Sequence, residues 1–69
     1  MVEVFKTDVY EQEISLAIVQ TLLQHFPGNE INFDLEDCDR ILRIEGENIL
    51  CERIKDVLHE AGYQCEVLD

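Results

Sequence analysis

The stretch INFDLEDCDRILRIE, residues 31–45, decides the fold of this chain. Apolar residues alternate with polar ones in both of its halves, which is the period-two pattern of strands that bury one face. The alternating apolar residues are Ile31, Phe33, Leu35, Leu42 and Ile44. The segment 37–39 between the halves is typical of a tight turn, so the stretch predicts two strands, 31–36 and 40–45, joined as a hairpin.

Segments of helical periodicity lie on both sides of this hairpin. Apolar side chains recur at helical spacing between residues 11 and 26 and again between residues 54 and 61. We expect these stripes to face the core. They consist of Leu16, Val19, Leu23 and Phe26, with Leu22 beside them, and of Ile54, Val57, Leu58 and Ala61.

The ends of both helices carry capping and breaking residues. Asp8 and Glu11 have the spacing of a capping box before the first helix, and Asn48 is a candidate N-cap of the second. The Pro-Gly-Asn run at 27–29 ends the first helix, and Gly62 suits the C′ position of the second.

Short strands at residues 2–7 and 64–68 complete the order strand, helix, strand, strand, helix, strand. Right-handed crossovers then predict a four-stranded antiparallel sheet in the order 4-1-3-2, with both helices on one face. This is the ferredoxin-like α/β sandwich, an α+β fold. The length of 69 residues allows a single domain, 1–69.

The chain is strongly acidic, with 16 Asp and Glu against 5 Lys and Arg, a net charge of −11 and a pI near 4.3. Five scattered cations cannot form a phosphate-binding patch, so we expect no nucleic-acid partner. The charge also disfavours anionic membrane surfaces. It permits a basic protein partner or multivalent cations.

Several features predict a cytoplasmic protein with reduced thiols. No apolar run approaches the roughly 20 residues of a membrane span, and the N-terminus lacks the basic and apolar regions of a secretory signal. The three cysteines, Cys38, Cys51 and Cys65, are odd in number and widely spaced, which does not suggest a disulfide framework.

With this order of elements the chain resembles the heavy-metal-associated domain, the fold of small copper chaperones and of metal-pump N-terminal modules. The resemblance covers roughly residues 2–68, and segment 26–28, Phe-Pro-Gly, is similar to the family's Leu-Pro-Gly. Its best stretch is 49–63, where the matching residues are Ile49, Ile54, Leu58, Ala61, Gly62 and Tyr63. These are structural positions, so the resemblance implies the scaffold.

The family's metal chemistry lies in a Met-x-Cys-x-x-Cys loop between the first strand and the first helix. Two thiolates at that spacing converge on one Cu(I) or Zn(II). In this chain residues 8–17 contain no Cys, Met or His. The resemblance therefore implies the scaffold without its metal clamp, and we expect no metal site and no cofactor.

The remaining cysteines do not rebuild such a site. We expect Cys65 to fill a core position, Cys51 to lie in the first turn of the second helix and Cys38 to be exposed. The helix dipole favours a lowered pKa for Cys51, whereas Glu47 and Glu52 oppose it.

An acidic rim is the most specific site that the sequence suggests. The expected topology brings the first loop, the hairpin turn and the connection before the last strand to one end of the domain. The residues collected there are Asp8, Tyr10, Glu11, Glu13, Asp37, Asp39 and Tyr63. Such a rim suits a basic partner, with the aromatic rings as anchors. In the alternative interpretation the hairpin acids face solvent and partly pair with Arg40 and Arg43.

Other sites are not supported. Residues 34–45 fail as a calcium loop, because Asp39 stands where the sharp turn needs Gly. His25 and His59 are single residues on different helices, without a cysteine at ligand spacing. No catalytic triad or phosphate-cradling loop is visible, so we expect no catalytic residues and no enzyme.

Three functions remain open at this point. The first is a non-enzymatic interaction or regulatory module on the metallochaperone-like scaffold. The second is a metal carrier that uses a displaced or carboxylate-rich site. The third is a small-molecule sensor that binds at a dimer interface through exposed strand edges. Because both edges carry acids, we expect a monomer or a weak dimer.

Overall fold

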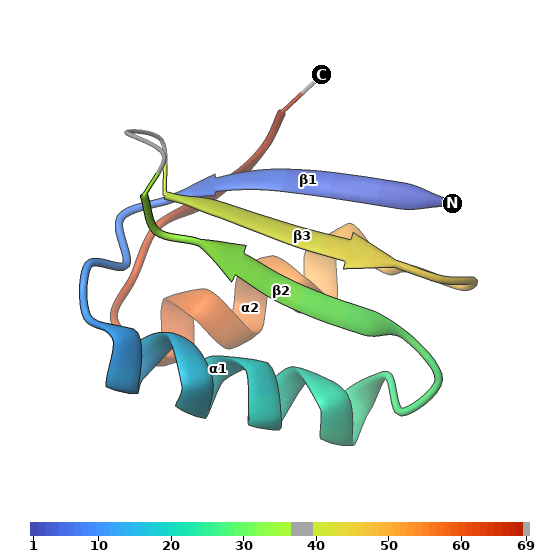
Figure 1. Ribbon diagram of the computed structural model, residues 1–69. Helices are drawn as coiled ribbons and strands as arrows, with labels where there is room; N and C mark the ends of the chain where they lie inside the picture. Colours follow the sequence, from blue (N-terminus) through green and yellow to red (C-terminus); the bar gives the residue numbers. More distant parts are fainter. Residues whose placement is uncertain (37–39, 69) are drawn as a thin grey trace.

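The computed structural model describes residues 1–36 and 40–68. Its elements follow the predicted order (Figure 1): β1 Val2–Thr7, α1 Gln12–His25, β2 Glu30–Asp34, β3 Ile41–Glu45, α2 Cys51–Glu60 and β4 Cys65–Val67. The sheet forms one layer and the two helices form the other, both on the same face of the sheet (Figure 1). The domain is therefore a two-layer α+β structure.

The four strands lie in the order β2-β3-β1-β4, and each neighbouring pair is antiparallel. Counted from the other edge, the same sheet runs β4-β1-β3-β2. Phe5 pairs with Leu42 on one side and with Val67 on the other, so these side chains share the face toward the helices. β2 and β4 are the edge strands.

The core lies between the sheet and the helices. Its buried apolar members are Phe5, Val9, Ile18, Leu22, Phe26, Ile31, Leu42, Ile44, Ile54, Val57, Leu58 and Cys65. The prediction that Cys65 fills a core position is confirmed, since its exposure is 4%. None of the buried residues in the described part of the chain is charged, so the acids lie outside this core.

The core stripe that we predicted for residues 11–26 is correct at Leu22 and Phe26, which are buried, but the face that α1 turns to the core is rotated from the predicted one. The buried residues of α1 are Ser15, Ile18 and Leu22. Leu16 and Leu23, which we expected inside, are 58% and 38% exposed. The buried Ser15 satisfies its own hydroxyl by donating to the carbonyl of Gln12 at 2.7 Å, which lets a polar residue occupy the inner face.

The predicted N-caps are also wrong. The N-cap residues are Glu11 for α1 and Leu50 for α2, and neither makes a side-chain capping hydrogen bond. Asp8 is engaged elsewhere, and Asn48 adopts a left-handed φ of 58° two residues before the α2 cap. The loops before both helices are therefore shaped by tertiary contacts and turns.

The end of α2 follows the prediction for Gly62 but not for Ala61. Ala61 is the exposed C-cap and lies outside the core. Gly62 has φ 92° and donates to the carbonyl of His59 at 3.0 Å, while the Tyr63 N–H donates to the carbonyl of Leu58 at 2.9 Å. These two bonds form a Schellman motif, which requires the left-handed residue that glycine provides.

Candidate functional site

Three connections meet at the end of the domain where β1 finishes (Figure 1). The Gln64 N–H donates to the Asp8 carboxylate at 2.8 Å, which joins the β1–α1 loop to the segment before β4. The Thr7 hydroxyl donates to the Arg40 carbonyl at 2.6 Å, which joins β1 to the start of β3. We call this region the loop end, and it comprises residues 7–11, 35–36, 40 and 61–64.

Tyr10 is the most exposed aromatic residue of the loop end, at 66%. The guanidinium of Arg40 lies over its ring, with 4.7 Å between Cζ and the ring centroid, in a cation–π contact. Arg40 also donates to the carbonyl of Leu35. The guanidinium thus ties Tyr10 to the β2–β3 connection, and the ring remains available at the surface.

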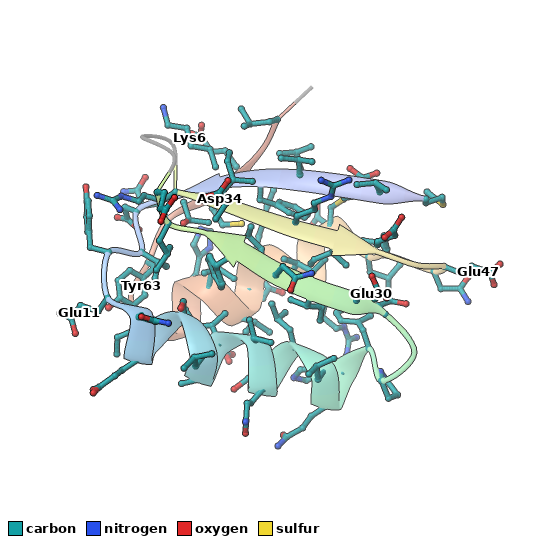
Figure 2. All side chains as sticks on the ribbon, viewed as in Figure 1. Lys6, Glu11, Glu30, Asp34, Glu47 and Tyr63 are labelled. Carbon is teal, nitrogen blue, oxygen red and sulfur yellow. The ribbon has the colours of Figure 1, made fainter. Side chains whose placement is uncertain are left out.

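Tyr63 differs from Tyr10 because it is half-buried and packs against the core. Figure 2 shows Tyr63 and Glu11 at the loop end, whereas Glu30 and Glu47 lie toward the opposite end of the domain. Glu11 and Glu13 are exposed at the α1 N-cap and in its first turn. The acids of the chain are therefore spread over both ends.

The structure brings together Asp8, Tyr10, Glu11 and Tyr63 of the predicted rim, with Glu13 in the adjoining helical turn. Asp37 and Asp39 lie outside the described residues. The sequence did not predict two contacts of the loop end. These are the hydrogen bond from Gln64 to Asp8 and the stacking of Arg40 on Tyr10. We had considered Arg40 as a partner of the hairpin acids, and no local pattern signals its contact with Tyr10.

The cysteines differ from each other in environment. Cys51 is the first residue of α2, as predicted, but its pKa is raised and not lowered. Burial is the main cause and the negative charge of Glu3 is the second, where we had expected Glu47 and Glu52 to act. Burial also raises the pKa of Cys65 to about 11. Cys38 lies outside the described residues.

Within residues 1–36 and 40–68, no group of three or more His, Cys, Asp or Glu side chains converges in a way that could hold a metal ion. In the same part of the chain, neither helix combines the length and the apolar character that a membrane crossing needs.

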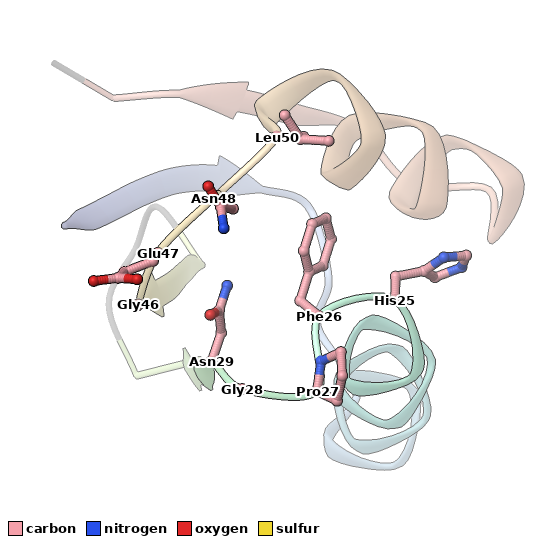
Figure 3. Close-up of a pocket in the computed structure, with 9 residues that line it drawn as sticks. All are labelled: His25, Phe26, Pro27, Gly28, Asn29, Gly46, Glu47, Asn48 and Leu50. Carbon is pink, nitrogen blue, oxygen red and sulfur yellow. The ribbon is translucent and has the colours of Figure 1, made fainter.

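An open hollow of about 550 Å³ lies at the end opposite the loop end, between the 26–29 turn and the segment before α2 (Figure 3). Its titratable lining residues are His25 and Glu47, which stand on opposite sides of it (Figure 3). The amide groups of Asn29 and Asn48 point toward each other across it, and Asn29 Nδ2 is buried without a hydrogen-bond partner. A hydrogen-bond acceptor placed between the two amide groups could accept from both of them. The side chains of His25 and Glu47 lie too far apart in this hollow to form an acid–base pair.

Comparisons with known protein families, with curated proteins and with solved structures found no match.

Proposed function

We propose that this chain is a small non-enzymatic interaction or regulatory module, which docks a basic protein through its loop end. The observation that carries this proposal is the exposed Tyr10, whose ring contacts the Arg40 guanidinium in a loop that also contains Asp8 and Glu11. In this proposal the scaffold is a ferredoxin-like one, similar to the heavy-metal-associated domain, in which the first loop presents an aromatic ring and acids in place of the metal clamp.

The contacts of the loop end support preorganised binding. The bond from Gln64 to Asp8 and the bonds from Thr7 to the Arg40 carbonyl cross-link three connections. A surface that is already ordered loses less conformational entropy when a partner binds. An exposed tyrosine adds a large apolar area with few rotatable bonds, which is why tyrosines are common anchors.

Charge supports a basic partner. The net charge of −11 attracts cationic surfaces over a distance of about 10 Å at 0.1 M salt and accelerates their encounter. The same field disfavours nucleic acids and anionic membranes. We therefore propose a monomeric or weakly dimeric protein of the cytoplasm that recognises a basic protein and uses no cofactor.

Site-specific photo-crosslinking in the native cell tests this proposal. The crosslinking residue replaces Tyr10 in one variant and Leu50 in the control, because Leu50 is also exposed, at 56%, and lies before α2. We expect a basic protein crosslinked from position 10 and not from position 50, with no stoichiometric metal in the captured sample by elemental analysis. Equal crosslinking from both positions, or a bound metal in stoichiometric amount, would contradict the proposal.

A further inference from the structure

The outer edge of β2 is open. Among residues 1–36 and 40–68, β3 is the only strand that pairs with β2. An edge strand directs a row of backbone N–H and C=O groups outward, and these groups can pair with an added strand. In Figure 1 α1 runs beneath β2, and no helix or strand of the described residues is drawn alongside its outer edge.

A groove of about 520 Å³ runs between β2 and α1. Its apolar lining comes from Leu16 and Val19 of α1 and from Ile31, Phe33 and Leu35 on the β2 side. Leu16 is 58% exposed, while Val19, Phe33 and Leu35 are half-buried against the core. Leu16, which we had wrongly assigned to the core, thus forms part of one wall of this groove.

The edge has two chemically different sides. Within β2, Ile31 and Phe33 point toward the helices and the groove, and the alternate residues point to the open face of the sheet. Those alternate residues are Glu30, Asn32 and Asp34, all exposed. A strand added at this edge would therefore meet apolar side chains on one side and the carboxylates of Glu30 and Asp34 on the other.

We infer that the β2 edge and its groove receive an extended segment of a basic protein as a fifth strand. The segment alternates Lys or Arg, which face the carboxylates, with aliphatic residues, which enter the groove. Backbone hydrogen bonds provide attachment and the alternating side chains provide specificity, as in other cases of strand addition. The inference rests on the proposed function, since the segment belongs to the basic partner.

Charge selects such a segment over a second copy of this chain. Antiparallel pairing of two β2 strands about Asn32 would place Glu30 of one copy opposite Asp34 of the other. Like charges directly opposite each other destabilise a strand pair, whereas opposite charges stabilise it. Dimerisation through β2 would thus strengthen at high salt, while a basic segment would bind more weakly there.

The experiment is an NMR titration of the whole chain with an acetylated and amidated seven-residue peptide that alternates Lys and Val. We expect amide shifts in residues 30–36 and in α1 around Leu16, and an affinity that falls roughly tenfold between low and moderate salt. Asp34→Lys should weaken binding roughly tenfold. Glu66→Lys makes the same change in net charge at an exposed site on β4, the opposite edge strand of the sheet, and it should weaken binding by less than about twofold.

Several results would overturn the inference. These are an equal loss in both charge variants, equally tight binding of a Lys–Ser peptide, or salt-promoted self-association with shifts in β2. Leu16→Gln should also weaken the Lys–Val peptide, and an unchanged affinity would remove the groove from the inference. A crosslink from position 10 without shifts in β2 would leave the proposed function standing and overturn this inference. Shifts in β2 without that crosslink would do the reverse.

Discussion

At the scale of the single residue, Gly46 occupies a position where any side chain would be strained. Its φ is 152°, and a Cβ at this position would overlap the side chain of Asn29. We expect Gly46→Ala to lower the free energy of unfolding by about 1–3 kcal/mol, as is usual for strained backbone positions. Urea denaturation followed by circular dichroism measures this change.

Gly28 offers the matched control for that substitution. A Cβ at Gly28 meets no atom within 4 Å, and its φ is not among the positive ones. Gly28→Ala should therefore leave the stability unchanged within about 0.5 kcal/mol or raise it slightly. Equal destabilisation by both alanines would show that Gly46 is not specially constrained.

Because of Cys65, we expect the free energy of unfolding to decrease at alkaline pH. Burial raises the pKa of its thiol from 9.0 to about 11 in the folded chain. The folded state thus binds the proton more tightly than the unfolded state. The resulting stabilisation is fully present below pH 9 and is lost as the pH rises through about 11. We expect a contribution of about 1–2 kcal/mol, measured by urea denaturation at pH 8 and pH 11.

Cys65→Ala separates this effect from the titration of other groups. The variant should be less stable at pH 8, because it loses a buried side chain, and its stability should fall less between pH 8 and pH 11. The same fall in both proteins would assign the pH dependence to groups other than Cys65.

At the scale of the element, α1 carries two apolar stripes, of which the fold buries one. Ile18 and Leu22 are 4% and 0% exposed, and Leu16 lies on the outer stripe at 58%. Ile18→Ala should lower the free energy of unfolding by about 2–4 kcal/mol, because it leaves a cavity. Leu16→Ala should cost less than about 1 kcal/mol. Thermal and chemical denaturation of the two variants measure the difference, and similar losses would contradict the observed rotation of α1.

The same helix shows why sequence reasoning succeeded in part. Helical spacing identifies the existence and the length of α1, because the period of apolar residues is a local property. It does not decide between two neighbouring stripes, since Leu16, Val19 and Leu23 satisfy the spacing as well as Ile18 and Leu22 do. The position of the sheet makes that choice. Strand alternation in β2 and β3 leaves no such choice, and Ile31, Leu42 and Ile44 are buried as predicted.

At the scale of the whole molecule, the charge of −11 lies outside the core and repels itself. Screening by salt should therefore stabilise the folded chain. We expect the Tm to rise by a few degrees between about 10 mM and 500 mM NaCl in a calorimetric scan. MgCl2 and CaCl2 at matched ionic strength should give the same rise. A larger rise with either divalent cation would indicate a specific site and favour the metal-carrier hypothesis.

At the loop end, the sequence predicted which residues come together but not which contacts they make. Topology rules predicted that Asp8 and Tyr63 share one end of the domain, because connections alternate between the two ends of an antiparallel sheet. The individual contacts were not predictable in this way. Asp8 had the spacing of a capping residue, yet it binds Gln64, 56 positions away in the chain. Arg40 had acidic neighbours, yet its guanidinium lies over Tyr10.

The sequence by itself determined the six elements, the alternation that buries one face of the sheet and the residue types of the first loop. These depend on the chemistry of neighbouring residues, which a pattern records directly. The tertiary structure alone decided which stripe of α1 is buried, which partners hold Asp8 and Tyr10, and why the thiol of Cys51 has a raised pKa. These features depend on segments that are distant in the sequence and are brought together by packing. The differences in free energy between alternative contacts of this kind are small, and a pattern of neighbouring residues does not record them.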